Sequence, residues 1–80
     1  MPTVLRIGPY RIGFFSKEDN EPPHVHVTRD RFTAKFWLEP TVELVESHGF
    51  KPHELNIIRA IVQEHRDLLL EAWRDHFRQA

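Results

Sequence analysis

The sequence contains no cysteine, and this absence excludes a disulfide framework, a thiolate metal cluster and thiol catalysis. Long hydrophobic runs are also missing, since no segment approaches the roughly 20 apolar residues of a membrane span, and we expect no export signal. Glycine is scarce, and Gly8, Gly13 and Gly49 are too scattered to form a phosphate-binding loop. We therefore expect a cytoplasmic protein with no membrane anchor and no cofactor.

The composition is that of a folded chain. Of its 80 residues, 40% are hydrophobic and 29% are charged, with two Trp, six Phe and one Tyr. This is too apolar for disorder and too short for a second domain, so we expect a single domain over residues 1–80, with a sheet in 1–46 and helix in 51–79. Because so small a core rarely supplies more than about 3–5 kcal/mol, an oligomer or a partner is expected to add stability.

Charge is distributed unevenly along the chain. Residues 1–38 hold six Lys or Arg against four Asp or Glu, whereas residues 39–80 hold five against eight. The basic excess falls where strands are predicted, and the acidic excess falls where helix is predicted. A net charge of −1 can therefore conceal a positive face on the sheet.

The first half of the chain predicts two β-hairpins. Residues 3–7 and 10–15 are rich in β-branched and aromatic residues and flank a Gly8-Pro9 turn. Residues 24–29 and 32–39 flank a turn at Asp30-Arg31, and residues 41–46 could add a short edge strand. With the helix that follows, this predicts an α+β fold built on a small antiparallel sheet of four strands, or five.

Two-residue turns fix which residues face each other across each hairpin. In the second hairpin the apolar pairs are Val25 with Phe36 and Val27 with Ala34, and the polar pairs are His24 with Trp37, His26 with Lys35 and Thr28 with Thr33. The same rule opposes Leu5 to Ile12 and Ile7 to Tyr10 on the core side, and Arg6 to Arg11 on the other. Phe15 breaks the alternation, so it is either an exposed aromatic residue or the sign of a bulge.

The last third has helical periodicity. Apolar residues recur at three- and four-residue steps from Leu55 to Phe77, with Pro52 suited to the first turn. One straight helix over 52–79 would be about 42 Å long, which is too long for a globule of this size. The helix, which we expect to pack on one face of the sheet, must therefore break near His65 or overhang. An overhanging end would need a second chain, which makes a homodimer through the C-terminal helix one expectation.

The polar face of the predicted sheet is the candidate functional site. Guanidinium, imidazole and aromatic groups together suit phosphate contact, base stacking and metal-independent RNA cleavage. Beside Lys35, His26 is expected to stay neutral and act as a base. We predict catalytic roles for His24, His26 and Lys35, and nucleic-acid contacts for Arg6, Arg11 and Trp37. A charged face that is merely solvated is the alternative.

The other histidines carry weaker signals. His24 and His26 could bind one metal ion with Glu21 or a distant His as a third ligand, but two imidazoles do not make a site, so no metal is assigned. His65 and His76 lie on the apolar stripe of the helix and are interpreted as core or interface residues. For His48, capping of the helix is the preferred interpretation.

Several segments together resemble a bacterial family known as domain of unknown function 4160. The residues that carry the resemblance include Glu21-Pro22-Pro23-His24-Val25-His26-Val27, Ser47-His48-Gly49-Phe50 and Glu64-His65-Arg66 through Trp73. The resemblance covers essentially the whole chain. It implies the toxin-like component of a two-gene toxin–antitoxin-type module, with a cognate small partner protein from an adjacent gene and RNA as a target. It assigns no catalytic residue. The alternatives are a non-enzymatic protein–protein interaction module and, ranked below it, a metal-binding protein built on His24 and His26.

Overall fold

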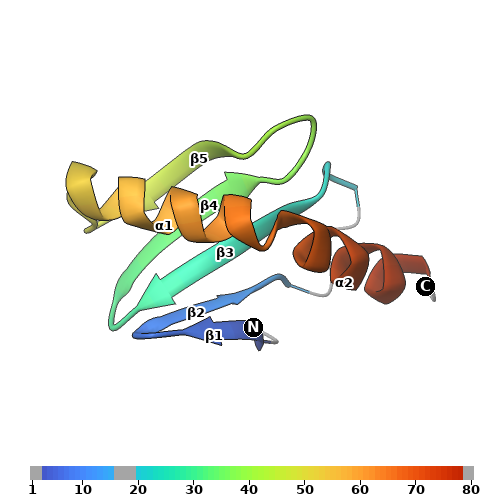
Figure 1. The fold of residues 1–80 in the computed structure, drawn as a ribbon, viewed down its shortest axis with the longest axis horizontal. Coiled ribbons are helices and arrows are strands. Elements are labelled where there is room, and N and C mark those ends of the chain that lie inside the picture. Colours follow the sequence, from blue (N-terminus) through green and yellow to red (C-terminus); the bar gives the residue numbers. More distant parts are fainter. Residues whose placement is uncertain (1–2, 16–19, 79–80) are drawn as a thin grey trace.

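A computed structural model describes residues 3–15 and 20–78 of the chain. Seven elements follow one another: the strands β1 (Thr3–Ile7), β2 (Tyr10–Gly13), β3 (His24–Arg29), β4 (Phe32–Trp37) and β5 (Glu43–His48), then the helices α1 (Pro52–Glu64) and α2 (Arg66–Arg78) (Figure 1). The fold is therefore α+β, with all the strands before the helices. No helix within the described part of the chain has the length and apolar content that crossing a membrane requires.

The strands form one antiparallel sheet in the order of the sequence, β1-β2-β3-β4-β5. The predicted pairing of both hairpins is confirmed, including Val25 with Phe36 and His26 with Lys35 in the second. The edge strand expected at 41–46 is present but begins at Glu43 and ends at His48. The expectation that His48 caps the helix is therefore wrong, because this residue ends a strand and the N-cap position belongs to Lys51.

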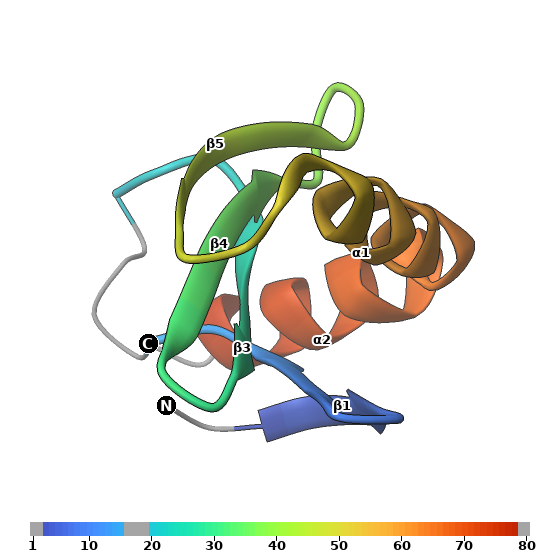
Figure 2. The same cartoon turned by 90° about the vertical axis from the view of Figure 1, so that its left-hand side faces the viewer.

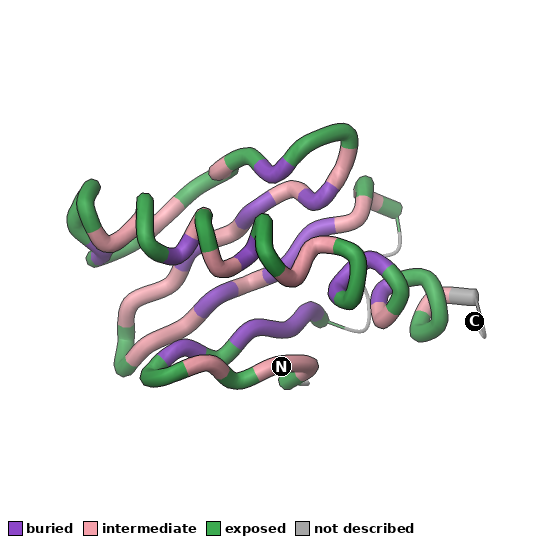
Figure 3. The backbone as a smooth tube through the Cα atoms, viewed as in Figure 1, coloured by how far each residue is buried: buried purple, intermediate pink, exposed green. Residues whose placement is uncertain are grey.

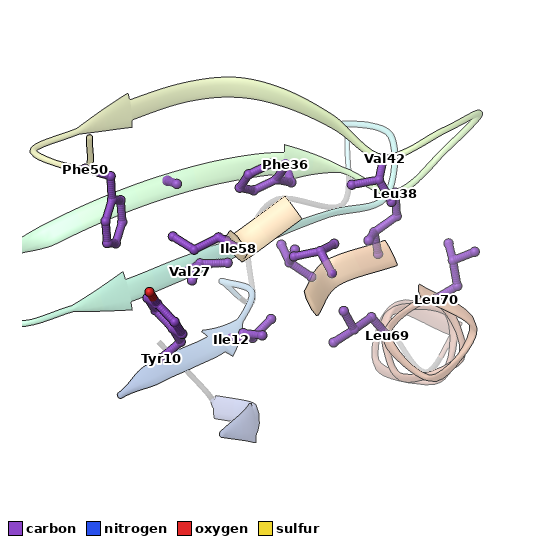
Figure 4. Packing of buried hydrophobic residues seen from close by; sticks show 13 residues of the cluster. Tyr10, Ile12, Val27, Phe36, Leu38, Val42, Phe50, Ile58, Leu69 and Leu70 are labelled. Atoms are coloured by element: carbon purple, nitrogen blue, oxygen red, sulfur yellow. The ribbon is translucent and has the colours of Figure 1, made fainter. Parts of the chain in front are cut away.

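The core lies between the sheet and the two helices, which occupy one side of it (Figure 2). Buried and partly buried residues alternate along the central strands, as expected for a sheet with one covered face (Figure 3). In Figure 4, Ile58 of α1 and Leu69 of α2 belong to the same buried cluster as Ile12 and Val27 of the strands. Leu5 and Ile7, which were expected on the core side, are only partly buried, and Leu5 packs against the cluster.

The helical segment breaks at His65, one of the two outcomes that the sequence left open. The Nδ1–H of His65 donates to the carbonyl oxygen of Ile61 at 2.9 Å, and its backbone N–H donates to the same oxygen at 3.1 Å. The His65 ring thus adds a second hydrogen bond to this carbonyl at the C-cap, and the helix ends there without Gly or Pro. The break keeps the longest dimension of the molecule to 36 Å.

The close approach of Phe32 to Gly49 explains a glycine after β5. Gly49 has φ +98°, and a Cβ at this position would lie 2.2 Å from the Phe32 ring. Only glycine fits both the backbone angle and the space. The turn leads into Phe50, which is buried against Phe32 and Tyr10 and covers the start of α1.

Candidate functional site

The face of the sheet opposite the helices is called the open face below. In the register of the strands, this face carries Arg6, Arg11, His26, Thr28, Thr33, Lys35 and Trp37. Glu43 and Glu46 of β5 lie opposite Trp37 and Lys35 and are exposed. The open face is therefore basic at β1 and β2 and acidic at β5.

A pocket of about 440 Å³ lies on the basic part of the open face and is called the open-face pocket. Its lining comes from β2, the residues just after it, β3, β4 and the turn between them: Arg11, Phe15, His26, Thr28, Asp30 and Thr33. The volume lies within the range of about 300–1,000 Å³ that is usual for small-ligand sites. Two of the six predicted site residues, His26 and Arg11, thus meet at one cavity.

Phe15 is the residue of this pocket that alternation places, as an apolar exception, on the polar face. Strand β2 ends at Gly13, and Phe15 beyond it still lies on the face that alternation from Arg11 indicates. Its side chain is 45% exposed, and its ring meets the His26 ring edge to face with 4.7 Å between the centroids. Of the two predicted possibilities, an exposed aromatic residue is the correct one.

Arg11 and Arg6 form the basic edge of the site. They oppose each other across β1 and β2, and both are exposed. Nη2 of Arg11 donates to Oγ1 of Thr3 at 3.3 Å, a weak contact that leaves the guanidinium at the rim of the pocket. Arg6 does not line the pocket and lies one strand further out.

Lys35 is engaged in a contact that the sequence interpretation missed. Its Nζ lies 2.6 Å from Oε1 of Glu21 and 5.0 Å from the centroid of the Trp37 ring, and its side chain is only 12% exposed. The Glu21 carboxylate offsets the ammonium charge, so the argument that Lys35 keeps His26 neutral loses its basis. Glu21 lies 14 residues away in the chain, and no local pattern pairs it with Lys35.

The expectation that His24 lies on an open polar face is wrong, because the residue is fully buried. Its ring lies 4.9 Å from that of Trp73 of α2 and 5.7 Å from that of Trp37, measured between centroids. Its Nδ1–H donates to the carbonyl oxygen of Pro22 at 3.0 Å, since a carbonyl can only accept. Strand alternation predicts on which side of the sheet His24 lies. It does not predict that α2, about 50 residues later in the chain, buries this side chain.

Trp37 and Glu21 are the remaining candidate residues. Trp37 is partly buried beneath the Lys35 ammonium and does not line the pocket. Within residues 3–15 and 20–78, no three His, Cys, Asp or Glu side chains converge as a metal site would require. Glu21, once weighed as a third ligand, contacts Lys35.

The family model described as Domain of unknown function (DUF4160) matches residues 10–74, most of the chain. The protein belongs to this family. The matched segment contains the whole open-face pocket together with Lys35, Trp37 and Glu21. Searches of the curated proteins and of the solved structures find no match.

Proposed function

We propose that this protein binds single-stranded RNA on the open face, with one nucleotide in the open-face pocket. The observation that carries the proposal is the meeting of a half-exposed aromatic ring, a guanidinium and an imidazole around one cavity, from Phe15, Arg11 and His26. Aromatic rings stack on any base, and guanidinium groups bind phosphate with two parallel hydrogen bonds.

Five of the six lining residues have a role in this proposal, and the sixth, Asp30, pairs with Arg29. The exposed part of the Phe15 ring stacks on the base, while Arg11 at the basic rim holds a backbone phosphate. The hydroxyls of Thr28 and Thr33, which oppose each other across β3 and β4, donate to or accept from base edges and the ribose 2′-hydroxyl. The 2′-hydroxyl contact favours RNA over DNA.

Cleavage of the bound strand is the reaction that suits this pocket, because an imidazole that can accept a proton lines it. The ribose 2′-oxygen attacks the adjacent phosphorus, the P–O5′ bond breaks, and a base accepts the 2′-hydroxyl proton. We assign the base to His26, because His24 is buried and Lys35 is paired with Glu21. The leaving 5′-oxygen takes its proton from water.

The family resemblance supplies the biological setting of the proposal: the toxin-like component of a two-gene module, neutralised by the small protein of the adjacent gene. Inducible expression of the chain alone should arrest growth, and co-expression of the neighbouring gene should relieve the arrest. The His26→Ala variant should fail to arrest growth at the same protein level. Equal arrest by this variant would contradict the catalytic assignment.

A protein–protein interaction module is the second candidate, and exposed apolar residues on the helices favour it. Ile57 of α1 is 51% exposed and Leu68 of α2 is 49% exposed. In this alternative the helices bind the partner, or a second copy of the chain, and the open face is merely solvated. The variant Ile57→Ser with Leu68→Ser would then lose the partner without any change in RNA binding.

The direct test of RNA binding uses a fluorescently labelled single-stranded oligonucleotide and measures anisotropy over a salt series. Arg11→Glu should weaken binding and make the slope of log K against log salt shallower by about 0.7, the value for one phosphate contact on a single strand. Phe15→Ala should weaken binding at every salt concentration, because a stacked base is worth about 1–3 kcal/mol.

Lys51→Glu is the matched control for the charge change. Lys51 is exposed at the start of α1, away from the open face, and an acidic residue is tolerated at a helix N-terminus. Unchanged RNA affinity in Arg11→Glu, or an equal loss in Lys51→Glu, would contradict a site at the open-face pocket.

A further inference from the structure

The ion pair between Glu21 and Lys35 lies beside the open-face pocket and has no part in the function proposed above. Lys35 lies directly opposite His26 in the β3–β4 register, and paired residues have Cβ atoms about 4.5–5.5 Å apart. A nucleotide in the pocket would therefore place a neighbouring phosphate within reach of Lys35. In the structure the Lys35 ammonium instead binds a carboxylate of the chain itself, with 2.6 Å between Nζ of Lys35 and Oε1 of Glu21.

We propose that the Lys35 ammonium is a second phosphate subsite, which Glu21 occupies in place of a phosphodiester until a backbone phosphate displaces it. Both groups offer anionic oxygens to the same ammonium. The identification of the phosphate with that of RNA rests on the proposed function, whereas the subsite itself does not. The interaction is an exchange of anions and involves no covalent step.

The ammonium is fixed and the carboxylate is the more accessible partner. The Lys35 side chain is 12% exposed, and Trp37 supports its Nζ at 5.0 Å from the ring centroid. The Glu21 side chain is 34% exposed, so solvent and dissolved anions can reach it. A pair with one accessible partner is weakened by salt and open to competition, which is what an exchangeable subsite needs.

The chain also holds Glu21 at this place through its neighbours. The Pro22 carbonyl accepts from Nδ1–H of His24 at 3.0 Å, and the Pro23 carbonyl accepts from the backbone N–H of Leu38 at 2.9 Å. The two proline rings restrict the backbone between these contacts. Buried His24 is in this way a positioning residue, since it fixes the segment that presents Glu21 to Lys35.

The test compares Glu21→Gln with Glu46→Gln. Glu46 opposes Lys35 from β5, and its side chain is 60% exposed with His48 as its partner at 3.8 Å. The two variants therefore make the same charge change on the same face, but only one removes the carboxylate held by Lys35. The side-chain Cε resonance of Lys35, assigned with Lys35→Met, reports on the subsite during a titration with inorganic phosphate.

We expect phosphate to move this resonance in Glu21→Gln at a concentration about fivefold lower than in the wild type or Glu46→Gln. In the anisotropy assay, Glu21→Gln should bind RNA about fivefold more tightly, and Lys35→Met in the same chain should remove the gain. Melting temperatures verify that all variants fold. If the Glu21→Gln variant does not fold, Glu21→Ala takes its place in both assays.

Equal effects of Glu21→Gln and Glu46→Gln would overturn the subsite, because they would reflect charge alone. A Lys35 resonance that ignores phosphate in Glu21→Gln would overturn it as well. If the subsite fails while Arg11→Glu still weakens RNA binding, the proposed function stands without it. If inorganic phosphate binds at Lys35 but RNA does not bind the protein, the subsite is supported, and its natural ligand is a phosphate group other than that of RNA.

Discussion

The two ends of β3 contact the helices through different kinds of interaction. At the start of the strand, His24 is buried among aromatic rings, with Trp73 of α2 at 4.9 Å. At its end, Arg29 binds Glu54 of α1 through two hydrogen bonds, from Nε to Oε2 at 2.7 Å and from Nη2 to Oε1 at 2.9 Å. One end is held by packing and the other by charge. Between them lie His26 and Thr28, which line the open-face pocket.

Hydrogen bonds and burial at the charged end shift the pKa values of Glu54 and Tyr10. Hydrogen bonds from Arg29 and then from Tyr10 lower the pKa of Glu54, because they favour its ionised form. Burial, followed by the hydrogen bond that its hydroxyl donates to Glu54 at 2.8 Å, raises the pKa of Tyr10. The Arg29 guanidinium also lies over the rings of Phe32 and Phe50, at 5.0 and 5.7 Å from their centroids.

The largest expected effect on stability belongs to the packed end. His24→Ala should lower the free energy of unfolding by about 3 kcal/mol, because it leaves a cavity under Trp73. His24→Phe retains a ring and should cost only about 1 kcal/mol, mainly for the lost hydrogen bond to Pro22. Urea unfolding measures both. As a control, His26→Ala on the open face should cost less than about 1 kcal/mol, and an equal loss in the two alanine variants would refute the comparison.

The charged end should determine the acid sensitivity of the fold. Because the folded-state pKa of Glu54 is below its ordinary value of 4.5, its stabilisation is fully present above pH 4.5 and is lost as the pH falls through the lowered pKa. Glu54→Gln should reduce the melting temperature by several degrees at pH 7, and this difference from the wild type should shrink in acid. Melting curves from pH 7 to 3 would show it. A difference that is independent of pH would mean that packing, and not charge, holds this end.

The smallest expected effect lies between the two ends. His26→Ala should weaken RNA binding about fivefold, because it removes one hydrogen-bonding ring from the pocket and the edge-to-face support of Phe15. Anisotropy measures the loss, and the urea midpoint should stay close to that of the wild type. A variant that loses stability instead of affinity would place His26 with the structural residues.

Much of the sheet could be predicted from the sequence, because short turns and strict alternation act locally. The pairs of both hairpins and the burial of Val25 and Val27 follow from these two features alone. The sequence also indicates the charged end of β3. By alternation Arg29 lies on the core side of the sheet, where a charged group needs a partner. Its partner Glu54 is 25 residues away, and no local rule identifies it.

The site was predicted less well, because its surroundings depend on distant segments. Alternation placed His24 and His26 on one face, but only the position of α2 decides that His24 is covered. The Glu21 carboxylate reaches Lys35 from a segment outside the hairpin, and at the helix break the His65 ring forms a hydrogen bond that no Gly or Pro signals in the sequence. Arg11 and His26 meet at the pocket because β2 pairs with β3, and residues 14–23 join these two strands, so turn geometry did not predict this register.

The most direct test of the central claim is a titration of ¹⁵N-labelled protein with a short single-stranded RNA, followed by amide chemical shifts. RNA binding on the open face predicts shifts concentrated at Arg11, Phe15, His26 and Thr28, with those around Ile57 and Leu68 unchanged. Shifts confined to the helices, or no shifts at RNA concentrations that saturate ordinary RNA-binding domains, would contradict the claim.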